Sequence, residues 1–124
     1  MFSLMLSSPS YAEWTQVGAN NKGTIYLDFG RVRENGGFVY FWSLIDLTAP
    51  IENGTPSENG TPSIKDYMQG DCGVFRVRSL DTHYYKKQMG IGKGKRITTD
   101  GKWMYPIPNS LMELVFKKVC ALKK

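Results

Sequence analysis

Residues 38–47 form the segment that most constrains the fold of this chain. Its residues alternate between two apolar sets, Phe38, Tyr40, Trp42 and Leu44 in one and Val39, Phe41, Ser43 and Ile45 in the other. Successive side chains of a strand point to opposite faces, so both faces of a strand here are apolar. Such a strand belongs in the centre of a sheet and is covered on both sides. One helix covers one side only, so we expect a partner, a second subunit or a ligand on the other.

Short apolar runs separated by Gly and Asn predict more antiparallel strands around this segment. We expect strands at residues 14–17 and 24–27, joined by a tight turn at residues 20–23, and a second turn at Asn35-Gly36. Later strands are expected over residues 72–80, 83–88 and 95–98. Residues 52–63 repeat Glu-Asn-Gly-Thr-Pro-Ser twice without an apolar side chain, which predicts a flexible hairpin loop.

The end of the chain predicts an amphipathic helix. Ser110 and Glu113 have the spacing of a capping box, in which each side chain pairs with a free amide of the first turn. Glu113 and Lys117, four residues apart, lie on the polar side. The apolar side comprises Leu111, Met112, Val115, Phe116, Val119 and Leu122. We expect this helix to lie on the sheet.

Cys72 and Cys120 are the two cysteines of the sequence. With one histidine and no Cys-x-x-Cys pair, a disulfide is favoured over a metal site, and two buried free thiols are the alternative. A disulfide would contribute roughly 3 to 4 kcal/mol by constraining the unfolded chain. Plain alternation puts Cys72 on the face of Arg76 and Arg78, so we hypothesise a bulge at Gly73 that corrects the register.

Residues 1–12 have the character of a signal-peptide remnant, with an apolar stretch from Phe2 to Leu6 and small residues at Ser10 and Ala12. The mature domain is then expected to begin at Glu13. No Lys or Arg precedes the apolar stretch, so a start further upstream or a truncation is expected. A first strand or a disordered tail is the alternative.

Positive charge is concentrated in the second half of the chain. Residues 1–61 carry three basic and six acidic side chains, whereas residues 62–124 carry thirteen basic and five acidic ones. Such a field attracts acidic glycans, anionic lipid surfaces, nucleic acid or an acidic protein patch, although a merely solubilising surface is the alternative. Of these, nucleic acid is not expected to be the partner. The candidate anion or partner contacts are Lys86, Lys87, Lys93, Lys95, Arg96 and Lys102. A possible aromatic interface comprises Phe41, Trp42, Tyr84 and Tyr85, and packing on the sheet is the alternative for these rings.

Catalytic patterns are weak. Residues 90–95 are rich in Gly and Lys but lack the spacing of a phosphate-binding loop. His83, with Asp81, Arg76 and Arg78, could imitate a small secreted nuclease, but acid-base catalysis needs a second group that the sequence does not place. We therefore expect no enzyme, no cofactor and no metal site.

Several segments resemble the surface-adhesin protein E family. They are residues 13–32, the pair Asp71-Cys72, residues 89–92 and residues 101–120, where the most specific pattern is Trp103, Pro108, Ser110 and Cys120. The resemblance covers most of residues 13–124 apart from the repeat. It implies one α+β domain, with an antiparallel sheet of about six strands and a C-terminal helix linked to it by a disulfide. It also implies a tendency to form dimers and no catalytic site.

The namesake of the family is a bacterial surface lipoprotein that binds host extracellular-matrix and plasma proteins. The resemblance therefore implies a non-enzymatic, exported binding protein of the cell envelope. No cysteine stands near the expected cut after Ala12, so a periplasmic or secreted protein is expected rather than a lipid-anchored one. The alternatives are a periplasmic assembly protein that acts as a dimer and, more remotely, a secreted nuclease.

Overall fold

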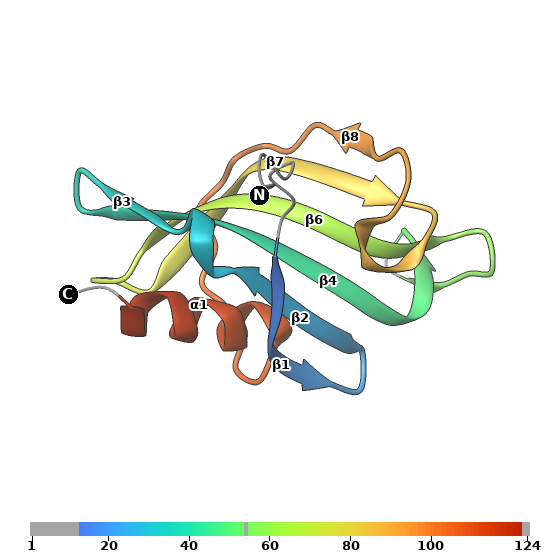
Figure 1. Ribbon diagram of the computed structural model, residues 1–124, viewed down its shortest axis with the longest axis horizontal. Helices are drawn as coiled ribbons and strands as arrows, with labels where there is room; N and C mark the ends of the chain where they lie inside the picture. Colours follow the sequence, from blue (N-terminus) through green and yellow to red (C-terminus); the bar gives the residue numbers. More distant parts are fainter. Residues whose placement is uncertain (1–12, 54, 123–124) are drawn as a thin grey trace, which may run out of the picture.

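The computed structural model describes residues 13–53 and 55–122, and the expected signal segment lies outside them. These residues form an antiparallel sheet with the helix α1 (Leu111–Leu122) packed on it (Figure 1), which confirms the expected α+β fold. The sheet runs in the order β1, β2, β4, β6, β7 and β8, and the short strands β3 and β5 also pair with β4. The strands are β1 (Trp14–Asn20), β2 (Gly23–Asp28), β3 (Arg33–Asn35), β4 (Phe38–Glu52), β5 (Thr55–Pro56), β6 (Thr61–Asp71), β7 (Arg76–Tyr85) and β8 (Lys95–Ile97).

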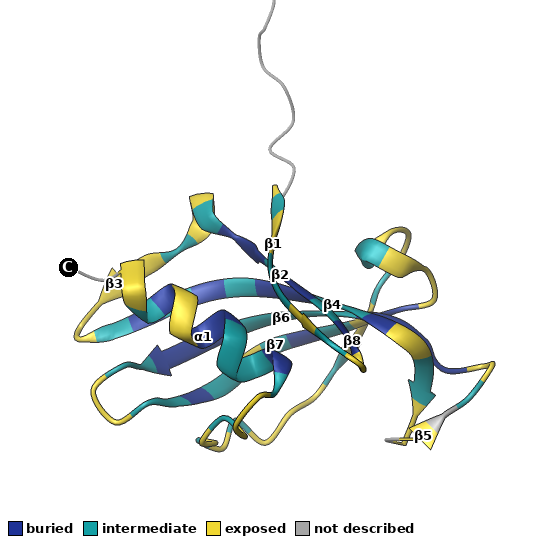
Figure 2. Cartoon of the chain, turned by 90° about the horizontal axis from the view of Figure 1, so that it is seen from below, coloured by how far each residue is buried: buried dark blue, intermediate teal, exposed yellow. Residues whose placement is uncertain are grey.

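Strand β4 lies between β2 and β6, the central position that its two apolar faces predicted. On the side that we call the helix face, Val39 and Phe41 are buried under α1, and the Phe41 ring stacks on Phe116. On the opposite side, the open face, Tyr40 and Trp42 are only partly buried. The apolar core is therefore one-sided, and α1 covers the helix face at one end of the sheet while the end with β5 extends beyond it (Figure 2).

The capping box begins α1 with one change of partner. Ser110 Oγ accepts a hydrogen bond from the Glu113 amide (3.1 Å), as predicted. Glu113 Oε1 accepts instead from the amide of Asn109 (2.9 Å), one residue earlier than a capping box requires, because Asn109 has a φ of +66° that turns its amide toward the helix. Lys117 Nζ lies 3.8 Å from Glu113 Oε1, which confirms the predicted pair. Leu122, expected on the buried side, is 41% exposed because it is the last residue of the helix.

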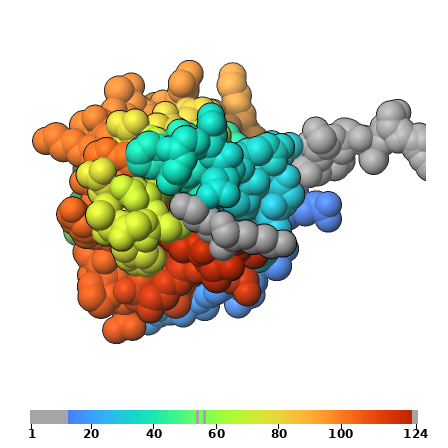
Figure 3. Space-filling view, turned by 90° about the vertical axis from the view of Figure 1, so that its left-hand side faces the viewer, coloured from blue at the N-terminus to red at the C-terminus, as the bar shows by residue number. Residues whose placement is uncertain are grey.

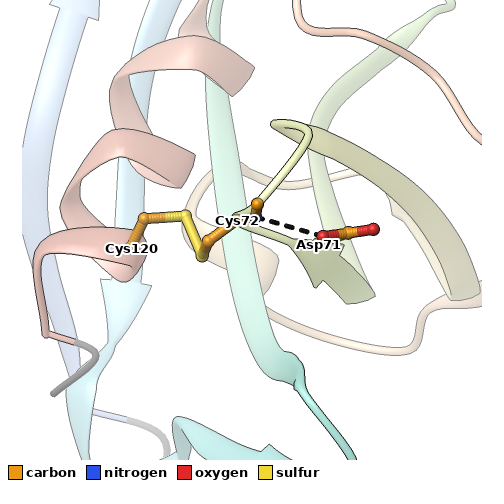
Figure 4. The surroundings of a disulfide bond; sticks show 4 residues. Asp71, Cys72 and Cys120 are labelled. Atoms are coloured by element: carbon orange, nitrogen blue, oxygen red, sulfur yellow. Dashed lines mark hydrogen bonds between the residues drawn. A yellow bond between two sulfur atoms is a disulfide. The ribbon is translucent and has the colours of Figure 1, made fainter.

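The predicted disulfide between Cys72 and Cys120 is confirmed, and the two Cα atoms lie 5.7 Å apart (Figure 4). It joins α1 to the turn between β6 and β7, where the Gly73 amide donates to Asp71 Oδ1 (3.1 Å). The helix and this turn lie side by side on the surface at this end of the molecule (Figure 3). Just before the turn, a Cβ on Gly70 would overlap the Phe116 ring, so this ring of the helix rests directly on the backbone of β6.

The expectations for β6 and β7 need correction. Strand β6 was not predicted, because buried polar residues such as Ser63 and Gln69 give it the composition of a loop. Cys72 lies in the β6–β7 turn rather than in a strand, and residues 76–85 form one strand where two were expected. The register shift falls at Leu80 instead of Gly73, since Ser79 pairs with Met68 and Asp81 with Tyr67. That extra residue puts Arg78 and His83 on the open face together.

The segment after β7 folds back onto the open face instead of continuing the strand to residue 88. The Met89 amide donates to Asp46 Oδ1 (3.0 Å), and the Gly90 amide donates to Ser63 Oγ (3.0 Å). Leu44 is fully buried on this side of β4, and a Cβ on Gly90 would lie 3.3 Å from its Cδ1. The open face is therefore partly covered by the chain itself.

The two copies of the six-residue repeat adopt different structures. In the first copy, Glu52 pairs with Thr55 and the chain turns back along β4 as β5. In the second copy, Gly60 crosses so close to Ile51 that a Cβ would overlap its backbone, and Thr61 then begins β6. Ile51 pairs with Pro56 in β5 and with Thr61 in β6. Part of the segment expected to be a loop is thus strand.

Candidate functional site

Several of the sequence-predicted residues converge at the repeat end of the sheet. They line a hollow of about 460 Å³ that we call the cationic cleft, between the repeat and the residues around β8. Lys86, Lys93 and Lys95 line it together with Tyr84 and Tyr85. The rest of the lining is Ile51, Glu52, Asn53, Asn59, Gly60, Thr61 and Ile97. Glu52 is the one acidic residue among the described lining residues, so the cleft is positively charged.

The three lysines of the cleft differ in their contacts. Lys86 Nζ donates to the carbonyl oxygen of Asn59 (2.8 Å), which ties the end of β7 to the second repeat. Lys93 and Lys95 are exposed, as is Tyr84, whose ring is 37% exposed. Two lysine ammonium groups and one aromatic ring are therefore presented to solvent at one rim. Carboxylates or sulfates are the groups that such a rim attracts.

The other three predicted cations lie outside the cleft. Arg96 Nε lies 2.9 Å from Asp81 Oδ1 across the β7–β8 pair, so its charge is already partnered. Lys87 and Lys102 are exposed and do not line the cleft. Of the six cations predicted as an anion site, the structure therefore brings Lys86, Lys93 and Lys95 together along the cleft.

Aromatic and cationic side chains alternate on the open face. The Trp42 ring lies 4.9 Å from Tyr67 and 6.3 Å from His83, measured between centroids. Further along, the guanidinium groups of Arg76 and Arg78 lie 4.4 and 5.0 Å from the Trp103 ring centroid. Of the four predicted interface aromatics, Trp42 is on this face and Tyr84 is at the cleft. Phe41 is 0% exposed, so it is not available as an interface residue. Tyr85 is 7% exposed and lines the cleft.

A second hollow of about 240 Å³ lies on the open face, and we call it the open-face hollow. It is lined by Trp14, Asp28, Arg31, Trp42, Lys65, His83 and Tyr85. Asp28 is 3% exposed as a residue, and its Oδ2 lies 3.4 Å from Arg31 Nε. Trp14, Asp28, Arg31 and Lys65 were missed as site residues. The sequence signal for Asp28 was that this acidic residue directly follows the apolar residues 25–27 of β2.

The residues that could imitate a nuclease are engaged in other contacts. His83 Nε2 lies 3.2 Å from Asp81 Oδ1, the oxygen that also faces Arg96. Arg76 and Arg78 stack on Trp103, and Arg78 Nε also donates to Gln69 Oε1 (2.7 Å). Within residues 13–53 and 55–122, no group of three or more His, Cys, Asp or Glu is placed to bind a metal ion.

Asp66 is a partly buried carboxylate on the helix face. Burial raises its pKa above the ordinary value of 3.8, although the hydroxyls of Ser79 (2.9 Å) and Thr82 (3.0 Å) donate to it and lower it in part. The charge of Asp81 raises the pKa further and His83 lowers it.

No helix among the described residues is long and apolar enough to span a membrane.

Comparison with protein families gives a match to the model of surface-adhesin protein E over residues 14–121. Comparison with solved structures shows the same fold in other proteins. A structure of Haemophilus influenzae protein E in its crystal form II has a TM-score of 0.62 at 16% identity, and the match covers 97% of this chain and 98% of that one. A second structure of H. influenzae protein E has a TM-score of 0.59 at 16% identity, with 96% and 92% covered.

Protein E from non-typeable H. influenzae has a TM-score of 0.55 at 15% identity, and the match covers 95% of this chain and 82% of that one. At such identities the structures show a shared fold. The curated proteins include none that matches this sequence significantly.

Proposed function

Because the chain belongs to the surface-adhesin protein E family, we propose that it is a non-enzymatic, exported binding protein of the bacterial cell envelope. Its partner is an acidic segment of another protein, held in the cationic cleft. The family resemblance implies host extracellular-matrix proteins as the class of partner. The place of action is the periplasm or the cell surface, which fractionation of the native cells tests.

The convergence of Lys86, Lys93 and Lys95 is the observation that carries this proposal. Lys86 and Lys93 come from the connection after β7 and Lys95 from β8, and the three meet along one cleft. A field of one sign in a concave site raises the local concentration of an oppositely charged partner. The exposed Tyr84 ring beside them provides the aromatic contact that protein interfaces favour.

The test measures binding of poly-glutamate and of a panel of purified extracellular-matrix proteins to residues 13–124. Changing Lys86, Lys93 and Lys95 together to Glu should weaken binding at least about tenfold at low salt. The matched control changes Lys87, Lys102 and Lys118 to Glu, which shifts the net charge equally but leaves the cleft intact. Wild-type affinity should fall steeply as salt rises.

Equal losses in the two triple variants would show that net charge alone matters and would reject the cleft as the site. Affinity that salt leaves unchanged would reject the acidic partner.

A periplasmic assembly role as a homodimer is the second candidate function. The observation in its favour is the open face, where the partly buried rings of Tyr40, Trp42 and Trp103 lie on one side of the sheet. A dimer through this face should persist at high salt, because apolar contacts are not screened. Light scattering of residues 13–124 at low and high salt tests it, and a monomer at high protein concentration would contradict it.

A further inference from the structure

We propose that the open-face hollow binds a neutral sugar ring, a single hexopyranose unit of a glycan. This site is separate from the cationic cleft and does not depend on the acidic partner proposed for it. The two hollows have one lining residue in common, Tyr85, and otherwise differ in charge and shape.

The walls of the open-face hollow are aromatic. Trp14 comes from β1, Trp42 from β4 and Tyr85 from β7, so three strands bring these rings together. The two indoles are partly exposed, which leaves ring surface available to a ligand. A pyranose ring has an apolar C–H side, and burying that side against flat aromatic rings removes it from water.

A buried carboxylate supplies the polar contact. The Asp28 side chain is only 5% exposed and lines the hollow, next to Trp14 in the β1–β2 register. Its Oδ2 makes the 3.4 Å ion pair with Arg31 Nε but accepts no hydrogen bond from the described residues. Asp28 Oδ2 therefore has an ion pair but no hydrogen bond, and a carboxylate oxygen can accept more than one donor. A ligand hydroxyl that donates to Asp28 would use this remaining acceptor capacity.

The charges around the hollow are mixed, because Lys65 and Arg31 are basic and Asp28 is acidic. Lys65 Nζ lies 5.9 Å from the Trp14 ring centroid and 5.2 Å from the Tyr85 centroid, so a cation stands beside the aromatic walls. A cationic ligand meets Lys65 and Arg31, and an anionic ligand meets Asp28. A polyol satisfies both kinds of group, because each hydroxyl can donate to Asp28 or accept from Lys65. A volume of about 240 Å³ is below the roughly 300–1,000 Å³ of pockets that enclose drug-sized ligands, so it holds one ring.

The experiment records the indole N–H signals of residues 13–124 by NMR during titration with methyl glycosides. The neutral probes are the methyl glycosides of glucose, galactose and N-acetylglucosamine, and the charged probes are methyl glucuronide and glucosamine. Trp14 and Trp42 should shift with at least one neutral probe, while Trp103, outside the hollow, serves as the internal control. Trp14→Ala should weaken binding about tenfold or more, and Trp103→Ala should leave it unchanged.

Asp28→Asn keeps the shape of the side chain and should also weaken binding about tenfold, because a charge-assisted hydrogen bond is replaced by a neutral one. The variant with Lys86, Lys93 and Lys95 changed to Glu should bind the sugar as the wild type does, so failure of the cleft proposal does not affect this result. The sugar site is rejected if no neutral glycoside shifts Trp14 and Trp42 up to its solubility limit. Shifts that Trp103 shares equally, or that only charged probes produce, reject it as well.

Discussion

At one end of the sheet, α1, the β6–β7 turn and the disulfide form what we call the disulfide end. At the other, residues 50–63 and 84–95 form the repeat end. The disulfide end is closed by apolar contact, with Phe116 fully buried on the backbone of Gly70. The repeat end is joined by polar contacts, such as Lys86 Nζ to the Asn59 carbonyl oxygen (2.8 Å), and carries the cationic cleft.

This difference separates the part of the sheet that holds the fold together from the part that we propose binds a partner. Apolar burial and chain cross-linking supply most of the free energy that holds a small domain together, and both are concentrated at the disulfide end. Exposed lysines and short polar strands contribute little to folding, which leaves the repeat end free to present charge. Changes at the disulfide end should therefore unfold the protein, and changes at the repeat end should alter binding with little loss of stability.

The largest expected effect comes from removing the disulfide. The double variant Cys72→Ser, Cys120→Ser releases a loop between residues 48 positions apart. The chain-entropy model gives a loss of about 4 kcal/mol in the free energy of unfolding. Urea unfolding of both proteins measures it, with the reduced wild type as the control. A loss below about 1 kcal/mol would mean that the disulfide end holds together without its cross-link.

Gly70→Ala tests the close contact of the helix with the sheet. The new Cβ would overlap the Phe116 ring and would lie 3.0 Å from Val39 Cγ2, so α1 must shift. Overpacking of this kind costs typically about 1–3 kcal/mol. Gly30→Ala is the matched control, because its nearest neighbour would be Asp28 Oδ1 at 3.6 Å. Equal stability of the two variants in urea would show that the helix is not tightly seated.

The disulfide end was the more predictable of the two. The apolar side of α1 and the central strand β4 follow from periodicity, the Ser110 cap follows from the capping-box spacing, and the structure confirms all three. The turn that holds Cys72 was taken for a strand, because Val74 and Phe75 look like strand residues. A positive φ of 53° at Phe75 is set by tertiary packing, which local sequence does not reveal.

The repeat end and the open face were less predictable. The cluster of lysines indicated a basic site, but the sequence could not separate Lys95, in the cleft, from its neighbour Arg96, paired with Asp81. The bulge at Leu80 decides which residues of β7 face the open side, and no turn residue marks it. Trp14 of β1 and Trp42 of β4 line the open-face hollow together because of the order of the strands in the sheet. That order depends on pairing between distant segments, which local sequence does not reveal.

A smaller effect on the free energy of unfolding is expected from changing Asp66, which lies in β6 between the disulfide end and the repeat end. Since burial raises its pKa, the folded state binds the proton more tightly than the unfolded chain does. Its ionised form therefore lowers stability at pH 7, and this penalty disappears as pH falls through the raised pKa. Asp66→Asn should stabilise the protein at pH 7 by less than about 1 kcal/mol, because the two hydroxyl contacts are partly weakened. The gain should shrink toward pH 4 in urea unfolding, and a gain that grows on acidification would contradict the raised pKa.

The smallest effect is expected from deleting one copy of the repeat, residues 52–57. Ile51 would then be followed by Glu58, Asn59 and Gly60 before Thr61, its present partner in β6. Three residues with Gly in the last position form a common hairpin loop, so β4 and β6 can keep their register. We expect the free energy of unfolding in urea to change by less than about 1 kcal/mol, since loop length has a weak effect on stability.

A variant with residues 52–57 replaced by a Gly-Ser linker of equal length separates the effect of loop length from that of β5. A loss above about 2 kcal/mol in both variants would place β5 in the cooperative fold, and the repeat end would then contribute to stability as the disulfide end does. Near-equal stability of the wild type and both variants would instead show that the first repeat copy, whose Glu52 and Asn53 line the cationic cleft, is not needed for folding.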